Sequence, residues 1–329
     1  MIHTRITKMF GINYPIIAGG LQWLATPEYV ASAAHAGIIG FLTAASFPDL
    51  TSLRTAIRRT RALCKDRPFG VNVSMLPKLI GDDAIPSILA VIIEESVNFV
   101  ETSGRNPAPY LARLKEGGVL VIHKVPTLRH ALRAQAEGVD AIALIGAEAG
   151  GHPGLELVGT IVQGALASRK ITIPLVIGGG IGSGAQLAAA LALGADGVLI
   201  GTRFLVCEEI QAHPAYKRRL IEADHTDTAL IMQSVSNTLR ILHNRLVPEI
   251  LAIEKESPGD IKRLLPLISG KRGRLAYETG NTEEAVLSVG QAVAFCSQVE
   301  PLATIINRLG EEAESAITRL QSYSTSIPH

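Results

Sequence analysis

Short apolar runs alternate with amphipathic stretches along the first two thirds of the chain. Several of these runs show no polar alternation, which is typical of parallel strands covered on both faces. In the stretches between them, apolar residues return at helical spacing. We expect strands at Pro15–Ala18, Ile38–Thr43, Phe69–Ser74, Phe99–Thr102, Leu120–Lys124, Ala141–Ile145, Leu175–Ile177 and Gly197–Ile200. We expect helices at Pro27–Ala36, Leu50–Leu63, Ile85–Ser96, Tyr110–Glu116, Leu128–Glu137 and Ala185–Leu193.

Four phrases repeat one arrangement, in which a helix end and a glycine precede an apolar strand. They are AHAGIIGFLT, KEGGVLVIHK, AEGVDAIALI and LGADGVLIGT. Glycine is favoured just after a helix because it adopts the left-handed conformation without penalty. Eight strand–helix units predict an α/β fold of the (β/α)8 TIM-barrel type. The count alone leaves an open doubly wound sheet as the alternative.

The alternation of strands and helices ends after Phe204. Charged phrases with a helical pattern follow, such as EEIQAHPAYKRRLIEA and NTLRILHNRLVPEILAIEKE. We expect residues 205–280 to form a mostly helical elaboration over the barrel mouth, serving as a substrate-binding or lid segment. Ala285–Cys296 is predicted to return as a barrel helix. Residues 1–204 and 281–329 then make up the barrel, and the two parts pack as one unit because no low-complexity linker separates them.

Composition narrows the possible partners. The chain has 329 residues, 47% of them hydrophobic, which is enough for a large core. A net charge of +1 gives no electrostatic case for nucleic acid or for an anionic membrane. The arginine cluster at residues 54–61 is interpreted as a solvated helix face.

Cysteine usage and the N-terminus indicate a cytoplasmic protein. Cys64, Cys207 and Cys296 are far apart and form no CxxC pair, which argues against disulfides and structural zinc. The N-terminal MIHTRITKMFG has no apolar signal-peptide core. Ile171–Ala195 lacks charge, but its glycines favour a strand, a loop and a buried helix over a membrane span.

Ligands of such barrels lie at the carboxyl ends of the strands, so residues that follow each strand are candidates. The phrase GGLQW at residues 19–23 allows close backbone approach to a flat ligand, and we expect this loop to face it; the alternative for Trp23 is a buried anchor. Asn72 and Lys124 lie in or at the end of apolar strands, where polar groups need partners. We favour ligand contacts for both; the alternatives are a backbone bond for Asn72 and a solvent-directed Lys124.

The most distinctive phrase is GAEAGGHPG at residues 146–154. Its glycine density predicts a loop whose backbone N–H groups can serve a ligand. It holds one side chain suited to proton transfer near neutral pH, His152. A lone histidine is usually structural, but the position at a strand end favours a catalytic role here.

Two further glycine-rich positions predict a phosphate site. Gly178-Gly179-Gly180 and Gly201-Thr202 follow the seventh and eighth predicted strands, where barrels commonly bind phosphate. The run fits neither GxGxxG nor a P-loop, and the alternative is that these glycines only permit tight packing. No metal motif, catalytic serine series or carboxylate pair stands out, so no metal is predicted.

These residues together resemble the nitronate monooxygenase (2-nitropropane dioxygenase) family over nearly the whole chain. The resemblance lies in RITKMFGINYPIIAGGLQW, RPFGVNVSML, GAEAGGHPG, IPLVIGGGIGSG, ALGADGVLIGTRF and HPAYK. GGLQW, VIHK, TALIMQSVSNTLR and SGKRGR are most similar to the branch of NADH:quinone reductases. Flavin enoyl-ACP reductases share EAGGH but usually lack a lysine at the position of Lys124.

The resemblance implies FMN as cofactor and oxidation of alkyl nitronates with O2, with His152 moving a proton at the carbon beside the nitro group. It leaves three alternatives: an NAD(P)H:quinone reductase using NADH or NADPH, a flavin enoyl-ACP reductase, and a non-catalytic flavin-binding scaffold. It also implies small-molecule substrates, and a homodimer is one expected assembly. The flavin contacts it implies are Gly20, Leu21, Gln22, Asn72, Lys124, Gly150, Gly151, Gly178, Gly179, Gly180, Gly201 and Thr202.

One position departs from the family pattern. Relatives usually carry Gln, Glu or Asp just before the glycine that opens the GxEAGGH loop, and this chain has Ile145. We expect a polar contact near the flavin to be missing there, which leaves the substrate open.

Overall fold

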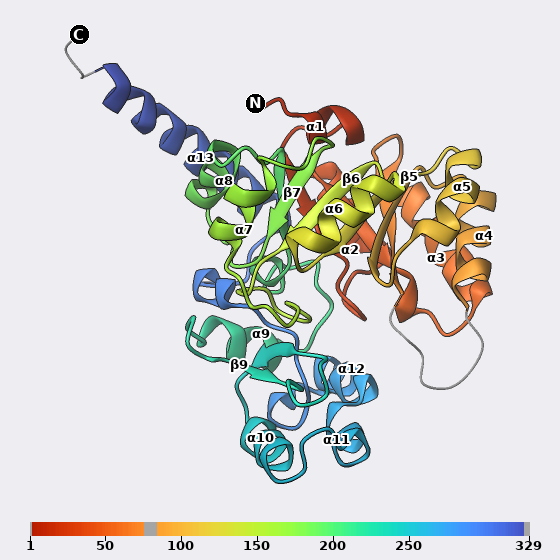
Figure 1. The fold of residues 1–329 in the computed structure, drawn as a ribbon, viewed down its shortest axis with the longest axis vertical. Coiled ribbons are helices and arrows are strands. Elements are labelled where there is room, and N and C mark those ends of the chain that lie inside the picture. Colours follow the sequence, from red (N-terminus) through yellow and green to blue (C-terminus); the bar gives the residue numbers. More distant parts are fainter. Residues whose placement is uncertain (1, 76–83, 326–329) are drawn as a thin grey trace.

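The computed structural model describes residues 2–75 and 84–325. Met1, residues 76–83 and residues 326–329, which fall within the predicted barrel ranges, lie outside the described part. Eight parallel strands close into a barrel in chain order, with the last strand paired to the first (Figure 1). The strands are β1 (Ile16–Ala18), β2 (Ile39–Thr43), β3 (Gly70–Met75), β4 (Phe99–Gly104), β5 (Leu120–Val125), β6 (Ala141–Ile145), β7 (Leu175–Gly178) and β8 (Gly197–Ile200).

The pairing of β8 with β1 confirms the predicted barrel and rules out the open sheet. Ile16 lies opposite Val198, and Ala18 lies opposite Ile200. Helices follow the strands and cover the outside of the barrel (Figure 1). They are α2 (Pro27–His35), α3 (Leu50–Cys64), α4 (Ile85–Glu94), α5 (Ala108–Glu116), α6 (Leu128–Glu137), α7 (Thr160–Ala167) and α8 (Gly184–Ala192).

A short helix, α1 (Arg5–Phe10), closes the end of the barrel where the strands begin. Thr4 caps it, because its side chain accepts from the backbone N–H of Thr7. Ile6 and Phe10 pack against the inward-facing residues of the strands, among them Phe41 and Phe99. The interior is therefore a packed core at this end, and only the opposite end, the barrel mouth, is left for a ligand.

The eighth outer helix is α13 (Leu302–Thr325), so the predicted barrel helix at Ala285–Cys296 is wrong. This segment is extended as far as Gly290 and continues into a short 3₁₀ turn, η4 (Gln291–Phe295). Ala285, Leu287 and Val289 are buried at every second position, which is strand-like periodicity. The run was mistaken for a helix because short apolar segments do not distinguish the two periods. α13 packs on α8 and α2, and in Figure 1 its C-terminal half extends away from the body.

The chain between η2 (Thr202–Phe204) and Gly280 forms a lobe beside the barrel mouth (Figure 1). Helices make up most of its regular structure, and it also contains an antiparallel hairpin that the sequence analysis did not predict. The hairpin and α10 share a small apolar core of their own, which includes Ile231, Ile241 and Ile250. The elements are α9 (Pro214–Ile221), β9 (Thr228–Ile231), β10 (Leu239–Leu242), α10 (Leu246–Glu256), α11 (Ile261–Ile268) and α12 (Gly270–Thr279).

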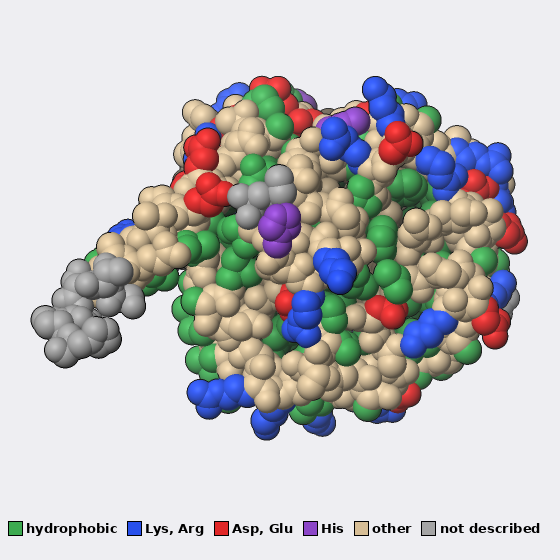
Figure 2. Space-filling view, turned by 90° about the horizontal axis from the view of Figure 1, so that it is seen from above, with side chains coloured by type: hydrophobic (Ala, Val, Ile, Leu, Met, Phe, Trp, Pro, Cys, Tyr) green, Lys and Arg blue, Asp and Glu red, His purple; other side chains and the backbone are tan. Residues whose placement is uncertain are grey.

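The face of the molecule that carries α1 has no segregated charge. Figure 2 shows basic and acidic side chains interspersed over this face, in keeping with the net charge of +1. Among the described residues, no helix is long and apolar enough to cross a membrane. Ile171–Ala195 forms β7, a glycine loop and α8, as the sequence predicted.

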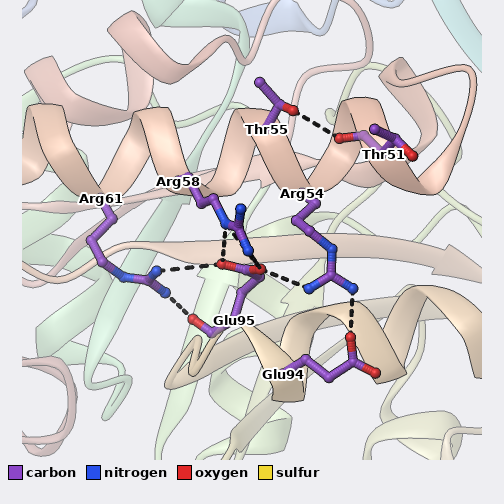
Figure 3. A network of polar contacts seen from close by, with 7 residues as sticks. All are labelled: Thr51, Arg54, Thr55, Arg58, Arg61, Glu94 and Glu95. Atoms are coloured by element: carbon purple, nitrogen blue, oxygen red, sulfur yellow. Dashed lines mark hydrogen bonds and ion pairs between the residues drawn. The ribbon is translucent and has the colours of Figure 1, made fainter.

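The predicted solvated arginine face of α3 is partly engaged in an ion network with α4. Arg54 and Arg58 reach the Glu95 carboxylate at 2.7 Å and 2.8 Å, and Arg61 donates to the Glu95 backbone carbonyl (Figure 3). Arg54 also pairs with Glu94 at 2.5 Å. A carboxylate at the end of a helix opposes the helix dipole, so these guanidinium groups offset an unfavourable position. The network fixes the angle between two neighbouring outer helices.

Glu95→Gln is expected to lower the free energy of unfolding by about 1 kcal/mol at pH 7, a value kept small because the arginines are solvent-exposed. Hydrogen bonds from Arg58 and Arg54 lower the pKa of Glu95 from 4.5 to about 2. A depressed carboxyl pKa contributes stability above the ordinary value of 4.5, and this is lost as the pH falls toward 2. Urea unfolding from pH 7 to pH 3 should therefore show a shallower acid loss in the variant.

Glu94→Gln is the matched control, because Glu94 is on the same helix end but is 57% exposed and pairs with one arginine. Its effect should be well below that of Glu95→Gln. Equal effects of the two variants would contradict a network centred on Glu95.

Candidate functional site

The predicted site residues lie together at the barrel mouth, as their strand-end positions implied. Asn72 and Lys124 belong to β3 and β5, and the loop with His152 follows β6. The other members come from the ends of β1, β7 and β8, and most are partly or fully accessible. Among the described residues, no group of three or more His, Cys, Asp or Glu is arranged to hold a metal ion. The members from those three strand ends are Gly20, Leu21, Gln22, Gly178, Gly179, Gly180, Gly201 and Thr202.

A row of polar side chains on neighbouring strands lies at the base of the mouth. Asn72 is buried and donates to Glu101 at 2.6 Å. Lys124 Nζ lies 3.0 Å from the other carboxylate oxygen of Glu101. The Thr43 hydroxyl is buried beside them and has no hydrogen-bond partner among the described residues. An orphaned buried hydroxyl is uncommon, and a ligand group at the mouth would satisfy it.

Glu101 and Thr43 were missed by sequence reasoning. The signal for Glu101 was present, because a glutamate inside the apolar run FVET cannot be buried without a partner. Asn72 makes a side-chain bond to Glu101, so the alternative of a bond to neighbouring backbone is wrong. Lys124 pairs with Glu101 and does not simply extend into solvent.

Asn72 also explains the glycine pair after β1. A Cβ on Gly20 would lie 2.7 Å from Asn72 and 3.0 Å from the Thr43 hydroxyl. Only a glycine backbone fits against these side chains. The sequence had assigned this glycine to close ligand approach, and the structure adds that it also makes room for Asn72.

The loop after β6 is anchored on both sides. Gly151 and Arg240 exchange two backbone hydrogen bonds, of 3.0 Å and 2.7 Å, which fasten the loop to β10 of the lobe. Glu148 accepts from the backbone N–H and the hydroxyl of Thr160 and so caps the start of α7. Gly150 lies against Gly290, whose backbone N is 2.6 Å from where a Cβ of Gly150 would be. These contacts hold the chain on both sides of His152.

The His152 side chain is accessible to solvent, but protein atoms surround much of its ring. The surrounding protein desolvates the ring and lowers its pKa below the ordinary value of 6.5. The positive charge of Lys124 lowers the pKa further. The imidazole is therefore neutral at physiological pH and available to accept a proton. His123 differs: it is buried, bonds to Thr102 at 2.8 Å, and burial lowers its pKa to about 4.

The glycines after β7 form a tightly enclosed backbone turn. Gly179 and Gly180 have φ of +106° and +73°, where a side chain is strained. A Cβ on Gly179 would also lie 2.8 Å from the Thr160 hydroxyl. Gly178 has no room either, because the side chain of Ile145 would be 2.9 Å from its Cβ. Ile145 thus fills space between β6 and β7.

At the predicted phosphate site, protein side chains already bind the backbone N–H groups at the start of α8. Gln186 accepts from the backbone N–H groups of Gly182 and Ser183, and Glu312 of α13 accepts from that of Gly184. The N-terminus of α8 is therefore already occupied by protein acceptors. The Thr202 hydroxyl accepts from the Gly290 N–H at 2.9 Å, which leaves its own proton to donate. Any phosphate contacts would come from the turn at Gly179 and Gly180 and from Gly201 and Thr202.

Trp23 links the barrel to the lobe. Its φ is +69°, unusual for a bulky residue, and its backbone N–H donates to Ser46 Oγ at 2.7 Å. The guanidinium of Arg274, on α12, lies 5.2 Å from the centre of its ring, a cation–π contact. Trp23 is half-buried, so it is not a fully buried anchor. Its ring contacts the lobe through Arg274 of α12.

A closed parallel barrel with glycine-rich loops and an exposed histidine at its mouth has the architecture in which barrel enzymes place their active sites. The chain matches the description of the family "Nitronate monooxygenase" over residues 3–312. It belongs to the nitronate monooxygenase family and is an FMN-dependent oxidoreductase.

Three relatives illustrate the family's breadth. FabK from Thermotoga maritima is 32% identical, with a TM-score of 0.89 and coverage of 98% of this chain and 100% of that one. Nitroalkane oxidase from Streptomyces ansochromogenes is 27% identical, with a TM-score of 0.83 and coverage of 96% and 99%. A hydroxy-methyl-oxo-octahydro-indene-carboxyl-CoA dehydrogenase of Rhodococcus jostii is 34% identical over 246 residues, 75% of this chain and 67% of the relative.

Gly179→Asp is expected to abolish FMN retention, since a carboxylate would be placed beside the phosphate and the backbone would be strained. Flavin absorbance per protein after purification and after added FMN measures this. Gly179→Ala introduces the backbone strain without the negative charge. Gly118→Asp is the control away from the site, because Gly118 also has a positive φ, of +71°, but open space around it. Fully loaded Gly179→Asp protein would show that the phosphate lies elsewhere.

Arg274→Gln is expected to make Trp23 more accessible, because a cation–π contact at an exposed site contributes about 0.5–1 kcal/mol. Trp23 is the only tryptophan in the chain, so the emission of the apoprotein reports on this contact alone. Red-shifted emission and stronger acrylamide quenching are expected, while Arg274→Lys, which keeps the cation, should change less. Identical quenching in all three proteins would contradict the contact.

Proposed function

We propose that this protein oxidises small alkyl nitronates with O2, using FMN and His152 as the acid–base residue. The observation that carries the proposal is the accessible His152 ring, held on a loop fastened on both sides and kept neutral by desolvation and by Lys124. A neutral imidazole accepts the acidic proton beside a nitro group, which generates the nitronate at the site. The Streptomyces nitroalkane oxidase with a similar fold supports this choice.

The residues at the mouth fit FMN in three respects. The turns at Gly150 and Gly178–Gly180 leave no room for side chains, so backbone lines that side of the mouth. The Thr43 hydroxyl is buried without a partner in the described part of the chain, and the Lys124 side chain is partly accessible. FMN supplies the electron transfer when bound, and the protein supplies binding, orientation and the proton route. Each flavin contact implied by the resemblance, Lys124 and Asn72 included, stays a prediction.

Three further predictions concern the surroundings of the site. Residues 205–280 are proposed to form the substrate-facing wall, because β10 and α12 contact the loops that carry Gly151 and Trp23. Use of NADH or NADPH as co-substrate stays a prediction, and so does the quinone reductase reaction that depends on it. A homodimer is likewise proposed, with sedimentation of the purified protein as its test.

Reduction or oxidation of acyl thioesters is the second candidate. The Rhodococcus relative is named as a carboxyl-CoA dehydrogenase, which makes this substrate class relevant here. α12 begins with Lys271, Arg272 and Arg274, of which Arg274 lies over Trp23, and basic side chains of this kind suit the phosphates of a CoA carrier. The enoyl-ACP reductase alternative belongs to this class.

His152→Ala is expected to lower kcat/KM for neutral nitroalkanes by about 10²–10⁴-fold, because general acid–base catalysis is lost. With nitronates formed beforehand, the loss should be much smaller, since their proton has already left. FMN content should stay unchanged. Equal losses with both substrate forms would contradict a proton-transfer role.

The pH profile gives a second test of His152. Because its pKa lies below 6.5, the residue remains unprotonated as the pH falls through that value, and nitroalkane turnover should persist there. Lys124→Met removes the nearby positive charge, so the pKa of His152 should rise and the acid limb of kcat/KM should move to higher pH. An acid limb at the same pH in both proteins would contradict the coupling.

Anaerobic mixing separates the reactions. Bleaching of the flavin by a nitronate but not by NADH supports nitronate oxidation, and bleaching by NADH supports a reductase that acts on quinones or enoyl thioesters. A bound flavin that no oxidant or reductant turns over would support a scaffold. Absence of any flavin, even after FMN is added, would overturn the FMN assignment.

A further inference from the structure

Glu101 is a charged side chain in the wall of the barrel interior. Phe99, two residues earlier on β4, packs inside the barrel with Phe10 and Phe41. Side chains alternate along a strand, so Glu101 points the same way, one step nearer to the mouth. Its exposed fraction is zero, where barrel interiors are normally filled by branched apolar residues.

Two neighbouring strands supply its partners. Asn72 lies opposite Glu101 in the β3–β4 register and donates to Oε2 at 2.6 Å. Lys124 Nζ lies 3.0 Å from Oε1 and arrives from β5, where Lys124 pairs with Ser103. The carboxylate therefore accepts a hydrogen bond from Asn72 at Oε2 and forms an ion pair with Lys124 at Oε1, which makes no hydrogen bond among the described residues.

The two charges differ in their access to the mouth. The Glu101 side chain is fully buried, whereas 24% of the Lys124 side chain is accessible. The lysine is therefore the member of this ion pair that solvent or a ligand can reach. Its field reaches His152 on the facing loop, where it lowers the pKa of the imidazole. A buried carboxylate is costly unless an opposite charge is paired with it, and Lys124 supplies that charge.

We propose that Glu101 is a positioning residue, which holds the Lys124 amine at the base of the FMN site and compensates its charge. This inference rests on the proposed FMN site and deepens it. Through Lys124, Glu101 sets how strongly the site favours the more negative, reduced form of the cofactor. It touches neither substrate nor cofactor itself.

Glu101→Gln keeps the size of the side chain and its ability to accept from Asn72 but removes the charge. The uncompensated Lys124 is then expected to raise the affinity for reduced relative to oxidised FMN by about tenfold. For a two-electron couple this corresponds to a midpoint potential about 30 mV more positive. Spectroelectrochemistry of the holoenzyme measures the potential, and fluorescence titration of the apoprotein measures the FMN Kd.

A double-mutant cycle tests whether Glu101 acts through Lys124. Lys124→Met alone should lower the ratio of the affinity for reduced FMN to the affinity for oxidised FMN. In the Lys124→Met background, Glu101→Gln should change this ratio by less than about twofold, because the amine through which Glu101 acts is gone. An equal tenfold effect in both backgrounds would overturn the positioning role, and so would no effect of Glu101→Gln in the wild-type background.

Thermal unfolding of the apoproteins shows which variants fold. If Glu101→Gln does not fold, Glu101→Asp replaces it, since the shorter carboxylate moves negative charge away from Nζ and should raise the ratio about threefold. A ratio that is unchanged or falls in Glu101→Asp would also overturn the proposal. If the wild-type protein binds no FMN, the proposed function fails; if FMN binds and Lys124→Met shifts its potential while the Glu101 variants do not, only this inference fails.

Discussion

The backbone pairing between β8 and β1 is the interaction on which the rest of the structure depends. It joins the two ends of the sheet over Ile16–Ala18, so that strands remote in sequence become neighbours. The loops after the first and last strands then meet: a Cβ on Gly201 would lie 3.6 Å from the Leu21 side chain. Because the strands are parallel, all their carboxyl ends open at the same mouth. With α1 filling the opposite end, the mouth is the place that closure leaves for a cofactor.

Backbone rather than side chains shapes much of that mouth. Gly150 and Gly290 lie so close that a Cβ on either would collide with the backbone of the other. This contact brings the extended segment before η4 across the mouth and places the Gly290 N–H on the Thr202 hydroxyl. Arg240 fastens the same loop to the lobe by its backbone. A rigid frame of this kind lets a single accessible imidazole be placed accurately, as proton transfer requires.

The ion pairs around Glu95 and those around Glu101 differ in strength because the two networks differ in burial. Around Glu95 the arginines are largely in solvent, which screens their attraction and limits the network to a contribution to stability. Around Glu101 the carboxylate is fully buried, so its interaction with Lys124 is strong and fixes geometry. Only the second network lies at the barrel mouth and reaches His152, so charge arrangement there affects chemistry as well as stability.

The sequence by itself determined the strand–helix alternation and the strand-end positions of Asn72, Lys124 and His152, whereas the pairing of β8 with β1 decided that the sheet closes. The alternation and these positions depend on local periodicity, on glycine conformations and on the rule that parallel strands share an end, all of which are readable along the chain. Local periodicity failed where a short apolar segment fits both periods, as at residues 285–296. Local periodicity also missed the hairpin that contains Arg240. The phrase NTLRILHNRLVPEILAIEKE has a helical pattern, but only its second half forms a helix, α10, and its first half contains β10.

Only the tertiary structure decided which polar groups meet. Glu101 and Lys124 are 23 positions apart in the numbering, and their pairing follows from the register of β4 against β5 and the inward alternation of both strands. The occupation of the α8 N-terminus by Glu312, and the contact of Trp23 with Arg274, likewise join distant segments. No local pattern encodes such contacts, because they depend on how the barrel closes and on where the lobe packs against its mouth.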